Sequence, residues 1–301
     1  MRRFLVNTLI FSLIIAAFLA AGELVARRLP SPYRYKDRWL QANGPAVNTL
    51  VLGHSQLYYG VRPELLGDSV FNLANISQSP HYDLALLEHY IDRLPNLRTV
   101  VMPVSYFTYR DVDLENDPLG WQLLVRYQTE MGVPLHGNLS KYNFLISDFD
   151  TYRGKLNNTV LHRSSNTCDT LGFGLGYSID RRRETAPTSG KWIARSHTMP
   201  YAGRDTAVLQ YQNRIIDLCR SHGAEAVFVT PPCWHTYREN IDTAQLAQMR
   251  RLFNTVRVEK NVRYFDFFDD TRFGNEDFFD AAHLSDRGAA KFASILRDSI
   301  F

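Results

Sequence analysis

A serine at position 55 follows an apolar run that ends at Gly53. Such a run is typical of a strand in an open, parallel α/β sheet, where ligands bind outside the carboxyl ends of the strands. A hydroxyl at this place can act as a nucleophile. A serine after a strand is also a common turn or helix-capping residue. Taken alone, Ser55 therefore leaves the chemical and the structural interpretation open.

A carboxylate and an imidazole stand three residues apart near the other end of the chain, at Asp280 and His283. A serine hydroxyl is a poor nucleophile at neutral pH, so it needs a base within hydrogen-bond reach that a third group orients. In a turn, Asp280 can hold one ring nitrogen of His283 while the other nitrogen faces Ser55. The three residue types together indicate nucleophilic catalysis by a serine.

Alternating strand and helix patterns surround these residues. Strands that alternate with helices predict a parallel sheet with helices on both faces. Five strands suit a flavodoxin-like order, 2-1-3-4-5, in a three-layer α/β sandwich. The predicted strands cover about 48–53, 70–74, 99–104, 226–230 and 262–267, and the predicted helices about 82–93, 206–221, 243–258 and 285–296.

A long segment after the third strand, at about 107–204, lacks this regularity and is rich in Asn, Asp, Gly, Ser and aromatic residues. A weakly patterned stretch of this length inside an α/β domain is usually a cap, a lid or a small subdomain. We therefore predict one α/β domain over residues 46–301 that carries this segment as an insertion.

An uncharged run from Phe4 to Gly22 is rich in Leu, Ile, Phe and Ala, and it roughly spans the hydrocarbon core of a bilayer. It is longer than the apolar region of a cleaved signal peptide, about 7–15 residues. The sequence thus favours a membrane anchor over residues 1–28, followed by a proline-containing linker over 29–45. Arginines at positions 2 and 3 favour a cytoplasmic start and a periplasmic or extracytoplasmic domain.

The formal net charge of +3 resides in residues 1–30, and residues 31–301 hold 30 basic and 30 acidic side chains. This balance gives no reason to expect nucleic acid as a partner. The three cysteines form neither a disulfide framework nor a zinc motif. Cys233, after the fourth strand, is a rival nucleophile, although a small buried residue is the commoner role. We expect the chemistry to need no metal and no organic cofactor.

Two segments resemble motifs of the SGNH (GDSL-like) hydrolase superfamily: Gly53-His54-Ser55 after the first strand, and Asp280-Ala281-Ala282-His283-Leu284 before the last helix. The resemblance covers about residues 46–109 and 206–300. It implies a flavodoxin-like sheet with Ser55 as nucleophile, His283 as base and Asp280 as orienting acid.

The other motifs of that family match less well. His54 stands where the family has an aspartate. Ser77 lies near the family's oxyanion glycine, and its N–H would serve together with that of Ser55. The Gly-x-Asn-Asp motif after the third strand is missing, and Ser105 is the substitute donor. We therefore assign Gly53, His54, Ser77 and Ser105 to the oxyanion and substrate side of the site.

The anchor, the insertion and the diverged third motif look most like envelope acyl-handling proteins, such as the alginate O-acetylation proteins and the DltD-like proteins of teichoic acid D-alanylation. This resemblance implies a membrane-anchored serine esterase or O-acyltransferase that acts on an acylated cell-envelope polysaccharide. The alternative is a catalytically weak or inactive accessory protein that binds a glycan or a membrane-bound acyltransferase.

Overall fold

The computed structural model describes residues 1–110, 121–133, 144–147, 149–161, 168–182, 186–200, 203 and 205–301. The chain forms two compact units. The N-terminal unit consists of residues 1–37 and 114–166, and the sheet unit consists of residues 38–113 and 167–301. Parts of the predicted insertion lie outside the described residues.

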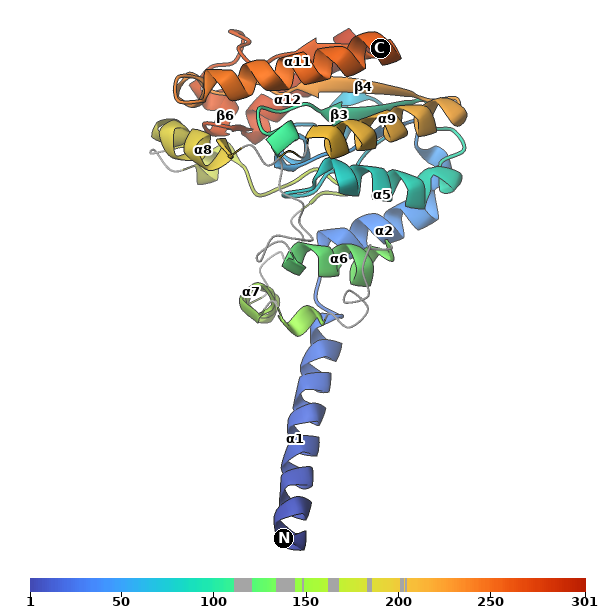
Figure 1. Ribbon diagram of the computed structural model, residues 1–301, viewed down its shortest axis with the longest axis vertical. Coiled ribbons are helices and arrows are strands. Elements are labelled where there is room, and N and C mark those ends of the chain that lie inside the picture. The colour runs from blue at the N-terminus through green and yellow to red at the C-terminus, as the bar shows by residue number, and fades with distance from the viewer. Residues whose placement is uncertain are drawn as a thin grey trace. The chain divides into compact units, whose positions relative to one another are not determined.

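Five parallel strands form the sheet, in the order β2-β1-β3-β4-β5. This is the predicted flavodoxin-like order, so the predicted α/β fold is confirmed. The neighbours β3 and β4 are labelled in Figure 1. The three residues of β1 and the five of β3 are all buried, as expected for strands covered by helices on both faces. The strands are β1 (Thr49–Val51), β2 (Val70–Asn72), β3 (Thr99–Pro103), β4 (Glu225–Thr230) and β5 (Arg263–Asp266).

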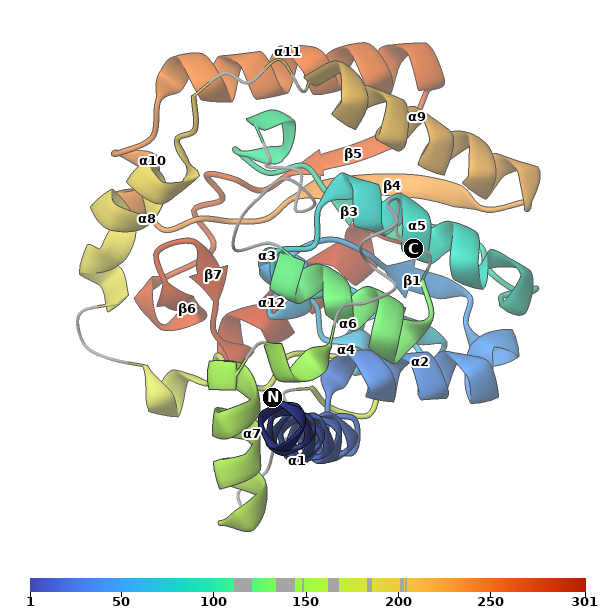
Figure 2. The ribbon, with the colours of Figure 1, turned by 60° about the horizontal axis from the view of Figure 1, so that its bottom comes forward.

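Helices cover the sheet on both faces. In one layer, α9 packs between α5 and α11, and Figure 2 shows α9 and α11 beside β4 and β5. The chain steps from β1 outward to β2 and then back past β1 to β3, so right-handed crossovers place α4 and α5 on opposite faces. Helix α12 packs against α4. The bounds are α4 (Pro63–Leu66), α5 (Pro80–Tyr90), α9 (Asp205–Ser221), α11 (Thr243–Lys260) and α12 (Asp286–Ile300).

The stretch predicted as a linker contains a helix, α2 (Pro32–Asn43). Proline is compatible with the first turn of a helix, since it lacks only an N–H that would be unsatisfied there. In the sheet unit, the Trp39 ring stacks on Phe71 with centroids 4.2 Å apart. The prolines therefore mark the start of a helix, and the segment predicted as a linker over 29–45 is largely helical.

The predicted insertion is divided between the two units. Its residues 114–166 belong to the N-terminal unit and its residues from 167 onward belong to the sheet unit. The N-terminal unit holds α6 (Trp121–Met131), the 3-10 helix η5 (Leu145–Ser147) and α7 (Phe149–Val160), whereas the sheet unit holds α8 (Gly190–His197).

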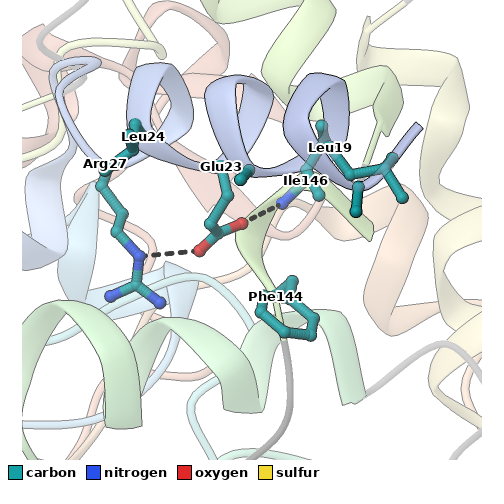
Figure 3. Close-up of a pocket in the computed structure, with 8 residues that line it drawn as sticks. Leu19, Glu23, Leu24, Arg27, Phe144 and Ile146 are labelled. Atoms are coloured by element: carbon teal, nitrogen blue, oxygen red, sulfur yellow. Dashed lines mark hydrogen bonds and ion pairs between the residues drawn. The ribbon is translucent and has the colours of Figure 1, made fainter. Parts of the chain in front are cut away.

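The N-terminal unit is built on α1 (Arg2–Ala26), which is long and apolar enough to cross a membrane, a property that anchors and signal sequences share. Its last turn joins a small core with Leu29, Val125, Leu145 and Tyr152. The buried Glu23 carboxylate accepts hydrogen bonds from Arg27 Nε at 2.8 Å and from the Ile146 N–H at 3.0 Å (Figure 3). This carboxylate ties η5 to α1.

Candidate active site

Ser55 is the first residue of a short helix, α3 (Ser55–Tyr58), just beyond the end of β1. The turn between them depends on Gly53, whose φ is +110°. A Cβ at this position would lie 2.3 Å from Cδ of Pro103, at the end of β3. Because only glycine tolerates both this backbone angle and this close approach, Gly53 fixes the position of Ser55.

We expect Gly53→Ala to lower the free energy of unfolding by about 2–5 kcal/mol, since it combines backbone strain with overpacking. Urea titration followed by circular dichroism measures the change. Gly274→Ala is the matched control, because a Cβ at Gly274 has no neighbour within 4 Å and its φ is −100°. Equal unfolding midpoints for the two variants would contradict this reading of Gly53.

Asp280 and His283 lie on a small antiparallel hairpin formed by β6 (Phe278–Asp280) and β7 (His283–Leu284), which the sequence patterns did not predict. The two residues are cross-strand partners. Ser285 then caps α12 by accepting a hydrogen bond from the Gly288 N–H at 3.2 Å, and its hydroxyl donates to the Glu276 carbonyl at 2.8 Å. The hairpin is thus fixed to the start of α12.

The hairpin brings His283 to Ser55, although 228 positions separate them. Nε2 of His283 lies 2.9 Å from Oγ of Ser55, and Nδ1 lies 2.9 and 3.0 Å from the two carboxylate oxygens of Asp280. An ionised carboxylate favours the proton on Nδ1, which leaves Nε2 as an acceptor for the Ser55 hydroxyl. The arrangement is suited to deprotonating the serine.

Asp280 is held in its ionised form by its surroundings. Burial alone would raise the pKa of Asp280, but the His283 ring and the N–H groups of Ala282 and His283 outweigh burial and lower it below the ordinary value. These two N–H groups donate to Oδ1 at 2.8 and 3.0 Å. The same hydrogen bonds shape the turn of the hairpin. The Asp280 carboxylate therefore has two roles, since it stabilises this turn and places a negative charge beside His283.

The backbone N–H groups of Ser55 and Ser77 were predicted to donate hydrogen bonds to the oxyanion. In the described part of the chain, no group accepts a hydrogen bond from the Ser55 N–H, which lies in the first turn of α3. Ser77 is exposed, in a turn after β2, and its φ is +55°. Glycine adopts this angle at the lowest cost, which agrees with the glycine that the resembled family has here.

Gly53 was assigned to the oxyanion side, but its N–H is occupied. It donates to Oδ1 of Asp83 at 2.7 Å, and Gln78 Nε2 donates to the same oxygen at 2.7 Å. The Asn75 side chain donates to Gln78 Oε1 at 2.9 Å, and its N–H donates to the Gly53 carbonyl at 3.0 Å. This buried network joins the loop before Ser55 to the turn that carries Ser77.

The sequence reasoning missed this network. Its one visible signal was a carboxylate, Asp83, among the apolar positions of a predicted helix. Burial raises the pKa of Asp83 to about 7, although its hydrogen bonds from Gln78 and Gly53 lower it. Asp83 therefore binds a proton more tightly in the folded protein than in the unfolded chain.

This difference predicts a pH dependence of stability. Because the folded state keeps the Asp83 proton from about pH 4 to about pH 7, the contribution of Asp83 to the free energy of unfolding should fall as the pH rises through this interval, by at most about 4 kcal/mol. Asp83→Asn should remove that slope. Urea titrations of both proteins across the interval measure it, with the exposed Asp92→Asn as control. Parallel curves for wild type and Asp83→Asn would contradict the prediction.

The prediction of Ser105 as an oxyanion donor was wrong. Its hydroxyl donates to Gln56 Oε1 at 2.6 Å and its N–H donates to Thr108 Oγ1 at 2.8 Å. Gln56 Nε2 in turn donates to the Ala282 carbonyl at 2.9 Å. A buried serine is normally paired with buried polar groups, and here the pairing supports the hairpin next to His283.

His54 caps α3 through its ring Nδ1, which accepts a hydrogen bond from the Gln56 N–H at 3.4 Å. The Phe107 ring lies between the rings of His54 and His197, at centroid distances of 4.8 and 4.5 Å. Burial, followed by the nearby His283, lowers the pKa of His54 to about 3 and that of His197 to about 4. Both rings are neutral at neutral pH and leave His283 as the base.

Three stacked rings border His283, and the sequence reasoning did not identify them. Tyr177 stacks between Tyr59 and Phe279, at centroid distances of 3.8 and 4.2 Å. Its ring meets the His283 ring edge-on at 5.2 Å. Close packing of Gly174 against Tyr59 holds the loop that carries Tyr177. The stack limits rotation of the imidazole and forms an apolar wall beside the reacting atoms.

Cys233 is buried, and Gln56 Nε2 lies 3.5 Å from its sulfur. Burial, with a smaller contribution from Asp280, raises the pKa of the Cys233 thiol far above its ordinary value, so it does not form the thiolate that a nucleophile requires. All three cysteines are buried, and none of them is in a disulfide. Among the described residues, no group of three or more His, Cys, Asp or Glu side chains is arranged to hold a metal ion.

Comparisons with known proteins give only distant structural matches. No protein-family model and no curated protein matches the chain. A protein of Bacteroides fragilis described as a candidate acylhydrolase is 8% identical, with a TM-score of 0.43 over 87% of this chain and 94% of that one. A lipase/acylhydrolase from Enterococcus faecalis is 12% identical, with a TM-score of 0.41 over 84% and 95%. We therefore rest the function on the geometry of the site.

Proposed function

We propose that this chain is a membrane-anchored serine esterase or O-acyltransferase of the SGNH type, acting outside the cytoplasm on acyl or acetyl esters of a cell-envelope polysaccharide or a related polymer. The main support for this proposal is the series of hydrogen bonds from Ser55 through His283 to Asp280. It combines a nucleophile, a base and an orienting acid at the carboxyl ends of parallel strands, where such sheets bind ligands.

The reaction begins when Ser55 Oγ attacks the ester carbonyl and its proton passes to Nε2 of His283. Asp280 stabilises the imidazolium that forms. The tetrahedral intermediate then expels the alcohol, which takes the proton from Nε2, and an acyl group stays on Ser55. Water completes hydrolysis, whereas a polymer hydroxyl completes acyl transfer, with His283 again acting as base.

The oxyanion of the intermediate would accept hydrogen bonds from the backbone N–H groups of Ser55 and Ser77. Such preorganised donors are often the largest single contribution to acyl-transfer catalysis. The Asp83 network supports this role, because it joins the loops that carry the two donors. The Tyr59–Tyr177–Phe279 stack would border the acyl group or the polymer.

The proposed location outside the cytoplasm depends on the apolar helix α1. The apolar helix would hold the chain in the membrane, with Arg2 and Arg3 on the cytoplasmic side and the sheet unit in the periplasm or outside the cell. An enzyme fixed in this way meets envelope polymers at the membrane surface. For acyl transfer, a membrane-bound acyltransferase is the partner that would supply the acyl group.

A second function is favoured by one observation. Ser105 stands where the resembled family has its third motif, and both of its donors are engaged away from Ser55. A site with one oxyanion donor fewer suits an accessory protein that binds a glycan or a membrane-bound acyltransferase and has little activity of its own.

A fluorophosphonate probe separates the two functions. We expect the full chain in detergent to be labelled at Ser55, with no labelling of Ser55→Ala. Ser221→Ala, which alters an exposed serine at the end of α9, should be labelled like the wild type. Unlabelled wild type, under conditions that label a known serine esterase, together with glycan binding, would favour the accessory role. Product analysis then distinguishes hydrolysis from transfer.

A further inference from the structure

Exposed apolar side chains gather beside the second half of α1 in the N-terminal unit. They come from the residue just before η5, from the second half of α7 and from the residue that follows α7, and we name them the apolar rim. Phe144 is 56% exposed, Leu156 42%, Val160 66% and Leu161 59%. Soluble surfaces rarely gather large apolar side chains in this way, and such patches mark contacts with proteins or membranes.

The rim adjoins η5, which packs against the membrane-spanning part of α1. A Cβ at Gly22 would lie 2.3 Å from Cδ1 of Ile146, so η5 contacts the backbone of α1 directly at this glycine. The hydrogen bond from the Ile146 N–H to Glu23 holds the same contact (Figure 3). Phe144 and Ile146 line one hollow together with Ala16 and Leu19.

The depth of these contacts follows from helix geometry. A membrane span needs about 20 residues. Counted from Phe4, where the uncharged run begins, the span ends near Glu23. At about 1.5 Å per residue, Ala16 lies about 10 Å inside that end. Phe144 borders a hollow that α1 lines from Ala16 to Arg27, so this hollow reaches from the edge of the hydrocarbon core into its interior.

Leu156 and Val160 continue the apolar surface along α7. Tyr152, Leu156 and Val160 are spaced by four residues and share one face of the helix. Tyr152 is buried in the core that includes Ala26 of α1. Leu156 lines a second hollow with Phe18 and Val25 of α1, and Val160 is 66% exposed. The face that begins in the core of this unit thus becomes an exposed apolar stripe.

Basic residues occur at the height where phospholipid phosphates would lie. Arg27 and Arg28 follow the end of the span. Apolar side chains below and arginines above are the pattern of an element that lies in the membrane interface.

We propose that the apolar rim inserts into the lipid leaflet that α1 enters, so that lipid acyl chains fill the two hollows and α7 lies at the membrane surface. This inference rests on the proposed anchoring by α1. It adds a second, monotopic membrane contact to the single span, and it fixes the N-terminal unit at the interface instead of leaving it on a free tether.

Depth-dependent fluorescence quenching tests the proposal on the full chain in phosphatidylcholine–phosphatidylglycerol vesicles. All native cysteines are buried, so a maleimide fluorophore reports introduced cysteines at Phe144→Cys and Val160→Cys. Leu19→Cys, within the span, is the positive control. Val258→Cys, 70% exposed on α11 of the sheet unit, is the negative control. Lipids with brominated acyl chains are the membrane quencher and iodide is the aqueous quencher.

We expect brominated lipid to quench the labels at positions 144 and 160 as it quenches position 19, and iodide to quench only position 258. Lipid quenching at position 19 with iodide quenching at positions 144 and 160 would overturn the inference and keep the anchor. Protection of positions 144 and 160 from both quenchers would also overturn it, because a protein would then cover the rim. Absence of lipid quenching at position 19 would refute the anchor and the rim together. The labelling of Ser55 by the fluorophosphonate probe is a separate readout of the chemistry.

Discussion

Ser55→Ala is expected to lower kcat on an activated acetyl ester such as p-nitrophenyl acetate by about 10³-fold or more, because no other group can form the acyl-enzyme. The remaining rate would come from water attacking an ester that the oxyanion donors still hold. Within the described part of the chain, the Ser55 side chain forms a hydrogen bond with His283 alone. The free energy of unfolding should therefore change by only about 1 kcal/mol.

Stopped-flow or steady-state hydrolysis measures kcat and KM, and thermal unfolding monitors the fold. Ser221→Ala is the matched control, since its hydroxyl donates to the Leu218 carbonyl and contacts the His222 ring at the surface. If Ser55→Ala retained the wild-type kcat/KM, Ser55 would not be the nucleophile and the accessory function would be the better explanation.

Asp280→Asn is expected to lower kcat by about 10³–10⁴-fold with little change in the fold. The asparagine Oδ1 can still accept the N–H groups of Ala282 and His283, which keeps the hairpin. Its uncharged amide no longer stabilises the imidazolium. Its NH2 group can also donate to Nδ1 of His283, which places the ring proton on Nε2 and blocks acceptance of the Ser55 proton.

The control for this variant is Asp277→Asn, which precedes the same hairpin. Asp277 Oδ2 accepts from the Gly274 N–H and from Lys291, both at 2.8 Å, so its carboxylate is engaged by groups other than the imidazole. We expect wild-type kcat for Asp277→Asn. The double variant Ser55→Ala/Asp280→Asn should be no slower than Ser55→Ala alone, since the residues act as one unit. Additive losses would contradict that unit.

The sequence determined the architecture because a buried parallel strand is encoded by a short, local run of apolar residues. The runs at 50–53, 100–104 and 226–229 are continuously apolar, and each overlaps a strand of the sheet. Their alternation with helices restricts the topology, since crossovers are right-handed. The position of Ser55 after one strand and the short spacing of Asp280 and His283 also required nothing beyond residue types and order.

Tertiary structure decided which polar groups are free to react. Ser105 and Gly53 have donors that the sequence cannot show as engaged, because their partners Gln56 and Asp83 come from other elements. The aromatic stack at Tyr177 and the helix after Pro32 likewise depend on neighbours that only folding supplies.

For Ser55, His283 and Asp280, the sequence and the tertiary structure supply different facts. Their chemistry is a property of side-chain type, and the sequence states it directly. Their 2.9 Å contacts depend on a hairpin fixed to α12 and a glycine turn packed on Pro103, which are contacts between distant parts of the chain. Hydrogen-bond partners are satisfied by whatever the fold brings near, so only the folded chain decides them.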